Sequence, residues 1–426
     1  MKTDKTGFSD VTTDGMTIGE RDETAPVSRR EFLKKASVAA GAAALLPAFP
    51  AVAAPLRGPV AEPAPPATSC GCDTADLVAF IEQQRIQGHL PALATAATNH
   101  GEIVWSRGFG LANIETGLHA TANTPFMLAS VSKTVMSVAV MQMWEQGKFG
   151  LDDDINALLP FPVCNPNFPS DPITPRQLLT HTSSLRDNWD ILTPLYVQGD
   201  SPISLATVCH DYFTSGAQYY DAAHNFKTYG PATRYSYCNM GATLAGYLVE
   251  AITGTPFDQW CMDNIFTPLG MDNTSWHLAG LDPAKVAMPY RYKPSGYYPY
   301  GQYGYPDYPD GQLRTSVHSL AKFLAAFSMG GIYQGTRILQ SATVEEMLTS
   351  QLGSITSWKQ GIIWYQTSGS SAGPLWGHNG GDWGVSTYMF FRRSDLSGAV
   401  VLANACRAWG ITRAVRDRLI NEAASL

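Results

Sequence analysis

The distribution of strand patterns along the chain constrains the fold more than any other feature. Two short strand-like segments joined by a turn at Asn99-His100-Gly101 occur near residue 100, and similar segments return only after residue 360: GIIWYQ, PLWGHNGG, DWGVSTYMFFRR and SGAVVLANA. From about 130 to 330 the pattern is mostly helical, and an amphipathic helix closes the chain. We therefore predict an α+β fold, an antiparallel sheet built from both chain ends and flanked by helices, with a helical subdomain at about 150–310.

The N-terminal 72 residues differ in composition from this folded unit. Arg29-Arg30 precedes an alanine-rich stretch, which resembles a twin-arginine export signal with a cleavage site at Ala51-Val52-Ala53. We predict a signal peptide over 1–53, an extended Pro/Ala-rich linker over 54–72 and a folded domain over 73–426. The protein is then periplasmic or secreted. An uncleaved anchor is the alternative, but the stretch is too alanine-rich and too interrupted by proline for a stable membrane span.

Charge and cysteine content exclude several classes of partner. The net charge is -7, with acidic and basic residues interspersed and no basic tract, so we expect no binding to nucleic acid. No close Cys/His group and no HExxH motif occurs, so we expect neither a metal nor a cofactor. The seven cysteines are an odd number, and neither their pairing nor the oligomeric state follows from the sequence.

A serine and a lysine three residues apart lie inside the apolar run LASVSKTVMSVAV, residues 128–140. A helix from about Ala129 to Gly147 places Ser130 and Lys133 on one face, with Ser130 in the first turn, where free N–H groups favour negative charge. We expect apolar neighbours around Lys133 to lower its pKa, so that it accepts the proton of Ser130. The S-x-x-K pattern alone is weak evidence, because Ser319 and Lys322 repeat it.

Two further motifs accompany this pair. Tyr237-x-Asn239 precedes a helix, and His378-x-Gly380 lies on a late strand. The three motifs, in this order and spacing, resemble those of the penicillin-recognising serine hydrolases, in the branch of class C β-lactamases, D-alanyl-D-alanine carboxypeptidases and esterases. The segments TPFMLASVSKT, ITPRQLLTHTSSL and NIFTPLGMDNTSW are also similar to that family. The resemblance runs from about residue 75 to the C-terminus and implies a β-lactamase/transpeptidase-like fold.

The resemblance also implies roles for individual residues. Ser130 is the acylated nucleophile, Lys133 its proton acceptor, and Tyr237 a proton shuttle to the leaving group. Asn239 binds the acyl side chain of the substrate, and the strand at His378 and Gly380 lies along the substrate. The N–H groups of Ser130 and Gly381 form the oxyanion hole. The implied substrate is a small ester, a β-lactam or a short D-amino-acid peptide.

Two positions depart from the family pattern. His378 stands where class C β-lactamases usually have lysine, which favours an esterase or peptidase over a β-lactamase. Cys238 stands where serine is common, and we interpret it as a buried thiol. A β-lactamase, an acyltransferase and a catalytically silent binding module of the same fold stay open as alternatives.

Three other sequence features are expected to have structural and not catalytic roles, or are left open between the two. The sequence GSSAG at 369–373 matches G-x-S-x-G, but no helix follows it, so we expect a flexible loop around Ser371. His181 is expected to make structural hydrogen bonds. The tyrosine-rich segment 290–308 is expected to be a loop that either walls a substrate cleft or packs on the surface.

Overall fold

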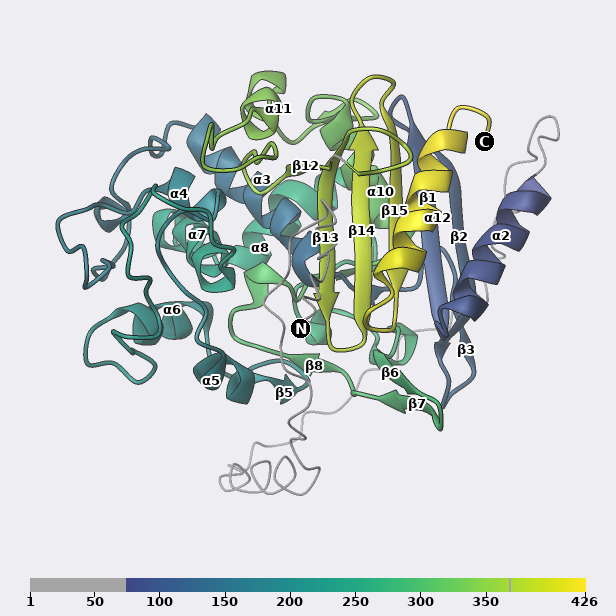
Figure 1. Cartoon of the computed structure of the whole chain (residues 1–426), viewed down its shortest axis with the longest axis horizontal. Coiled ribbons are helices and arrows are strands. Elements are labelled where there is room, and N and C mark those ends of the chain that lie inside the picture. Colours follow the sequence, from purple (N-terminus) through teal and green to yellow (C-terminus); the bar gives the residue numbers. More distant parts are fainter. Residues whose placement is uncertain (1–73, 368) are drawn as a thin grey trace, which may run out of the picture. The chain divides into compact units, whose positions relative to one another are not determined.

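The computed structural model describes residues 74–367 and 369–426, so the predicted signal peptide and linker lie outside the described residues. The described chain contains a seven-stranded antiparallel sheet with the strand order β12-β13-β14-β15-β1-β2-β3 (Figure 1). Its strands are β1 Ala92–Asn99, β2 Glu102–Asn113, β3 Leu118–His119, β12 Tyr365–Thr367, β13 Leu375–Asp382, β14 Val385–Arg392 and β15 Ser397–Ala403.

The two ends of the chain meet in the middle of this sheet. Strand β1 pairs with β15 from Leu93↔Ala403 to Thr98↔Gly398. In β15, Val400 and Leu402 pack into one hydrophobic cluster and Val401 into another. Successive side chains of a strand point to opposite faces, so both faces of the sheet are buried. The predicted α+β sheet built from both chain ends is confirmed.

Helices cover each face. On one side lie α2 Thr74–Gln87 and α12 Trp409–Glu422, and on the other lies α10 Val317–Ser328 (Figure 1). Leu77 and Ile81 of α2 share a buried cluster with Val415 and Leu419 of α12. The cluster also contains side chains from the sheet face that these two helices cover. Burial of such apolar side chains contributes about 1.5–3 kcal/mol each.

The middle of the chain forms a helical region beside β13. Its helices are α3 Ser132–Glu145, α4 Pro175–Leu179, α5 Trp189–Leu192, α6 Leu205–Phe213, α7 Asn239–Thr253, α8 Phe257–Cys261 and α9 Thr267–Leu269, and α11 Ser341–Leu348 follows α10. Helices α3 and α7 pack together in the large core cluster that also contains the inner face of the sheet. No helix within the described ranges has the length and apolarity that a membrane span needs.

The tyrosine-rich segment is more structured than the sequence suggested. It contains the hairpin of β6 Tyr290–Lys293 and β7 Gly296–Pro299, and β8 Tyr303–Gly304, which pairs with β5 Val197–Gln198. Further short strand pairs are β4 Phe126–Met127 with β9 Arg314–Thr315, and β10 Ile332–Tyr333 with β11 Thr336–Arg337. The prediction of a plain loop was therefore wrong, because tyrosine favours strands and these rings pack on one another.

Candidate active site

Ser130 lies in a short 3-10 turn, η1 Ala129–Val131, which leads directly into α3. The expected single helix over Ala129 to Gly147 is thus divided, and α3 itself ends at Glu145. Ala129 has a φ of +48°, in the left-handed region that residues with a Cβ seldom adopt. The backbone is strained immediately before the serine, as is common at functional residues. Ser130 is 7% exposed, and Lys133 is fully buried.

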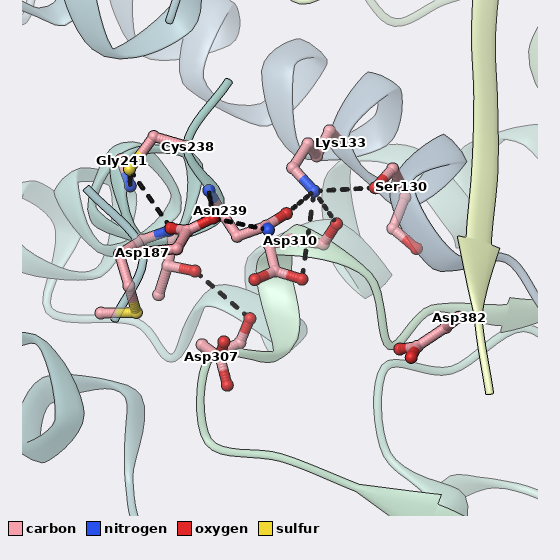
Figure 2. A network of polar contacts seen from close by, with 12 residues as sticks. Ser130, Lys133, Asp187, Cys238, Asn239, Gly241, Asp307, Asp310 and Asp382 are labelled. Atoms are coloured by element: carbon pink, nitrogen blue, oxygen red, sulfur yellow. Dashed lines mark hydrogen bonds and ion pairs between the residues drawn. The ribbon is translucent and has the colours of Figure 1, made fainter. Parts of the chain in front are cut away.

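The Lys133 ammonium donates three hydrogen bonds. Its Nζ lies 3.1 Å from Ser130 Oγ, 2.7 Å from Asn239 Oδ1 and 2.6 Å from the backbone oxygen of Asp310 (Figure 2). An ammonium has three N–H bonds, so these three acceptors satisfy it completely. The amide oxygen of Asn239 and the carbonyl oxygen of Asp310 can only accept, so they fix the directions of two N–H bonds of Lys133. The third tetrahedral direction of Nζ then points at Ser130 Oγ.

Four aspartates influence this lysine. Burial lowers the pKa of Lys133, whereas the charges of Asp310, Asp187, Asp307 and Asp382 raise it, in that order of strength. The nearest carboxylate oxygen, Oδ1 of Asp310, lies 4.0 Å from Nζ. Burial in turn raises the pKa of Asp310 well above its usual range, against the attraction of Lys133. The expected apolar surroundings of the lysine were wrong: its amine is buried, but among oxygen atoms.

Asp187 orders the start of α7. Its Oδ2 accepts the backbone N–H of Asn239 at 2.9 Å and the Nδ2 of the same residue at 2.8 Å, and its Oδ1 accepts the Met240 N–H at 2.9 Å. It also accepts the thiol of Cys238 at 3.3 Å. Because Asp187 accepts from Nδ2, the Oδ1 of Asn239 turns toward Lys133. Sequence reasoning missed Asp187 and Asp310, because neither belongs to a motif.

Asn239 is thereby engaged at both ends within the protein. Its Oδ1 holds Lys133, and its Nδ2 holds Asp187. This arrangement makes Asn239 a positioning residue for the lysine. Contact of Asn239 with a substrate's acyl side chain stays a prediction.

The Tyr237 hydroxyl is buried beside Ser130 without a hydrogen-bond partner among the described residues. Burial raises the pKa of Tyr237 well above its usual range, and the nearby Ser130 hydroxyl opposes this, although the two groups do not reach hydrogen-bond geometry. The ring centroid lies 5.1 Å from Lys133 Nζ and 4.3 Å from the centroid of His181. Tyr237 is therefore a neutral phenol with its proton available near the serine and the lysine.

Strand β13 brings the third motif to the serine. A Cβ on Gly380 would lie 2.3 Å from the Leu128 oxygen and 3.0 Å from the Ser130 nitrogen, so only glycine permits this approach of β13 to η1. His378 donates from Nδ1 to the Asn379 oxygen at 2.5 Å, and burial lowers its pKa to about 3. The imidazole is neutral, with a buried Nε2 that has no partner among the described residues. The contribution of Gly381 to an oxyanion hole stays a prediction.

Comparison with known proteins identifies the family of the chain. The sequence profile of the family described as Beta-lactamase matches residues 77–420. The chain belongs to the beta-lactamase family. The predicted family and fold are therefore confirmed.

Individual members of the family share about a quarter of the sequence. Penicillin-binding protein 4 of Amycolatopsis lactamdurans is 26% identical over 330 residues, which cover 72% of this chain and 78% of that protein. The protein flp of Staphylococcus aureus (strain MRSA252) is 24% identical over 197 residues, which cover 46% of this chain. This chain therefore spans only 37% of the length of flp.

Solved structures show the same fold. The D-amino acid amidase of Ochrobactrum anthropi SV3, complexed with L-phenylalanine amide, superposes with a TM-score of 0.65 at 20% identity, over 82% of this chain and 99% of the amidase. EstCE1, a hydrolase with promiscuous acyltransferase activity, gives 0.64 at 21% identity, over 80% of this chain and 97% of that one.

The competing serine motifs have structural partners elsewhere in this beta-lactamase fold. Ser319 Oγ donates to the Asp272 oxygen at 2.8 Å, and the half-buried Lys322 donates to the Gly270 oxygen. Ser371 Oγ donates to Asp417 of α12 at 3.0 Å. The GSSAG segment is a loop that leads into β13 and not into a helix, as predicted, and its flexibility stays a prediction.

His181 has the structural contact that its sequence position suggested. Its Nδ1 accepts the backbone N–H of Cys238 at 3.3 Å, so this nitrogen carries no proton and the imidazole is neutral. Burial lowers the pKa of His181 well below its usual range.

Proposed function

We propose that this member of the beta-lactamase family is an exported serine hydrolase, which acts through an acyl-enzyme at Ser130 on esters or on D-amino-acid peptides and amides. The observation that carries the proposal is the buried Lys133. Its Nζ is held by Asn239 and Asp310, and its third hydrogen bond, of 3.1 Å, is to Ser130 Oγ. Burial of an amine costs free energy, which a proton-accepting role beside a nucleophilic serine explains.

The geometry supports the following acylation step. When Lys133 is neutral, its lone pair occupies the position that faces Ser130, and it takes the Oγ proton as Oγ bonds to the substrate carbonyl carbon. The carbonyl oxygen becomes an oxyanion beside the N–H groups of Ser130 and Gly381. Its collapse breaks the bond to the alcohol or amine, which takes a proton from the neutral Tyr237; the lysine proton then restores the phenol.

Deacylation reverses these roles with water. A water molecule attacks the acyl carbon while its proton passes to the amine of Lys133, directly or through Tyr237. The bond to Ser130 Oγ breaks, Oγ regains a proton, and the carboxylic acid leaves. Each turnover consumes one water, and no external cofactor enters this balance.

A class C-like β-lactamase is the alternative within the family. The neutral His378 disfavours it, because β-lactams carry a carboxylate that a cationic lysine at this position would attract. An acyltransferase shares every step up to deacylation, and the fold likeness to EstCE1 supports keeping it as an alternative. A catalytically silent cell-wall binding module is the third alternative. Export through a twin-arginine signal and a periplasmic or secreted location belong to our proposal on the strength of residues 1–53 alone.

Intact-mass measurement tests the proposed function. The protein from Ala54 onward is exposed to a fluorophosphonate and, separately, to a penicillin, beside the variants Ser130→Ala and Lys133→Met. We expect a fluorophosphonate adduct that is absent in Ser130→Ala and much slower in Lys133→Met. Circular dichroism checks that each variant is folded, and Lys322→Met is the matched control for loss of a lysine in the second S-x-x-K. No adduct on folded wild-type protein would support the silent module, and persistence or turnover of a penicilloyl adduct would support the penicillin-directed alternatives.

A further inference from the structure

The hairpin of β6 and β7 projects beyond the ends of the sheet strands (Figure 1). Its base is fixed to the body of the fold: the Tyr290 N–H donates to the Asn404 oxygen at 3.0 Å, and the Tyr290 hydroxyl accepts the Ile114 N–H at 2.8 Å. From Tyr292 to Pro299, every residue except Gly296 is exposed. The hairpin is therefore an anchored element with a free tip.

Exposed tyrosines occupy both faces of this hairpin. Tyr292 lies opposite Tyr297 across the two strands, and Tyr298 points to the other face, because successive side chains of a strand alternate. The three side chains are 38%, 37% and 44% exposed. A tyrosine combines an apolar ring with a polar hydroxyl, so it is favoured where water meets an apolar medium. The free tip thus presents rings suited to such a boundary.

The charge of this segment is opposite to that of the whole chain. Residues 283–306 contain Lys285, Arg291 and Lys293 and no acidic residue, whereas the chain has a net charge of -7. Neither Arg291 nor Lys293 forms an ion pair with a carboxylate of the described residues, and Lys293 Nζ lies 5.4 Å from the centroid of the Tyr298 ring. The hairpin is therefore electrostatically complementary to an anionic partner.

The acidic character of the rest of the chain acts mainly on the hairpin base. Glu115 accepts the Tyr290 hydroxyl there, and Glu82 of α2 is paired with Arg85. A four-residue strand is about 13 Å long. Interactions between exposed charges are screened over about 8 Å at physiological ionic strength. The exposed basic group at the tip, Lys293, is thus partly screened from carboxylates at the base.

We propose that the hairpin of β6 and β7 docks the protein on the surface of an anionic lipid bilayer, with its tyrosines among the lipid headgroups and Arg291 and Lys293 at the lipid phosphates. A sugar polymer would need a flat platform of rings. The rings of Tyr292 and Tyr297 are tilted by 51°, and one face of Tyr292 is covered by the stacked His89 ring at 4.0 Å. A bilayer interface, which surrounds the tip, needs no common plane. This docking does not depend on the chemistry at Ser130.

Sedimentation with lipid vesicles tests the proposal. The vesicles contain phosphatidylcholine alone or mixed with phosphatidylglycerol. Both the full chain and the protein from Ala54 onward are measured, so that binding through the first 53 residues is separated from binding through the hairpin. We expect the protein from Ala54 onward to sediment with the anionic vesicles, less so at high salt, and not with the neutral ones.

Paired substitutions in the hairpin separate its charges from its rings. Arg291→Gln with Lys293→Gln should lower the partition coefficient on anionic vesicles about tenfold. Tyr297→Ser with Tyr298→Ser should lower it about three- to tenfold, since less apolar surface enters the interface.

Lys148→Gln with Lys359→Gln, at exposed positions outside the hairpin, removes the same charge and should preserve binding. Fluorophosphonate labelling of Ser130 should be unchanged in every variant, which shows that the fold is intact. Absence of binding to anionic vesicles, or an equal loss in the control and the Arg291/Lys293 variant, would overturn the proposal. Sedimentation with insoluble peptidoglycan but not with vesicles, lost in the tyrosine variant, would overturn it in favour of a sugar polymer.

Discussion

Lys133 Nζ lies 2.6 Å from the backbone oxygen of Asp310 and 4.0 Å from its carboxylate, so one residue holds the lysine by two different groups. Gly246 of α7 makes this possible, because a Cβ there would lie 2.8 Å from Pro309 Cβ. The turn that carries Asp310, η7 Tyr308–Asp310, can therefore approach α7 and α3 closely. The carbonyl orients the amine, whereas the carboxylate raises the pKa of the lysine against the larger, opposite effect of burial.

Replacement of Asp310 by asparagine should shift the pH dependence of acylation. Asp310 is the strongest group that raises the pKa of Lys133, so Asp310→Asn should lower that pKa further. The neutral amine is the active form, and kcat/KM for a neutral ester should rise at a lower pH than in the wild type. Rates from pH 5 to 10 measure the shift. Asp307→Asn should move the rise in the same direction by less, and a rise at unchanged or higher pH in Asp310→Asn would contradict the assignment.

Asn239→Asp should move the same profile the other way. It would place a carboxylate at the position now 2.7 Å from Lys133 Nζ, which raises the pKa of the lysine. The rise of kcat/KM should then occur at higher pH. The new charge would also face Asp187, now 2.8 Å from the Asn239 amide, so thermal unfolding should occur at lower temperature. A profile that coincides with that of Asp310→Asn would exclude the proton-acceptor role of the lysine.

The buried His378 should make stability depend on pH. Its pKa in the folded protein is about 3, whereas the ordinary value is 6.5, so between these values only the unfolded chain binds the proton. Stability is therefore lost as pH falls from 6.5 toward 3, by up to about 1.4 kcal/mol per pH unit. His378→Gln should show a smaller slope of unfolding free energy against pH, measured by urea denaturation. His119→Gln, which removes an exposed histidine, is the comparison, and equal slopes in the two variants would contradict the prediction.

Asp187 should matter for stability as well as for catalysis. It accepts two backbone N–H groups in the first turn of α7, which have no partners within the helix. Asp187→Ala should lower the free energy of unfolding by about 1–3 kcal/mol, measured with urea at neutral pH. Asp190→Ala, at an exposed position of the same segment, is the control. A loss of activity without any loss of stability would limit Asp187 to positioning Asn239.

Cys238 should be inert toward thiol reagents in the native protein. Burial raises its pKa well above the usual range, and Asp187 adds to this effect. Iodoacetamide should label the exposed Cys164 far faster than Cys238, as measured by peptide mass mapping. Cys238→Ser should retain acylation at Ser130, because a serine hydroxyl can also donate to Asp187. Rapid labelling of Cys238 with concurrent loss of activity would give this thiol a reactive role instead.

The sequence by itself determined the fold and the principal motifs. The early hairpin and the late strands predicted a sheet from both chain ends, because period-two apolar patterns are local and survive without tertiary information. Ser130, Lys133, Tyr237, Asn239 and the strand at His378 and Gly380 came from motif order, and the structure gathers them at one place.

Only the tertiary structure decided how the lysine is held. Asn239 and Asp310 follow Lys133 by 106 and 177 residues, and contacts over such separations leave no periodic or spacing signal. Asp187 and Asp382 belong to no sequence motif. The packing of α3, α7, η7 and β13 nevertheless brings both carboxylates close enough to raise the pKa of the Lys133 amine. The sequence therefore determined which serine can react, whereas the tertiary structure determined the charges that surround it, because electrostatic interaction depends on distance in space and not along the chain.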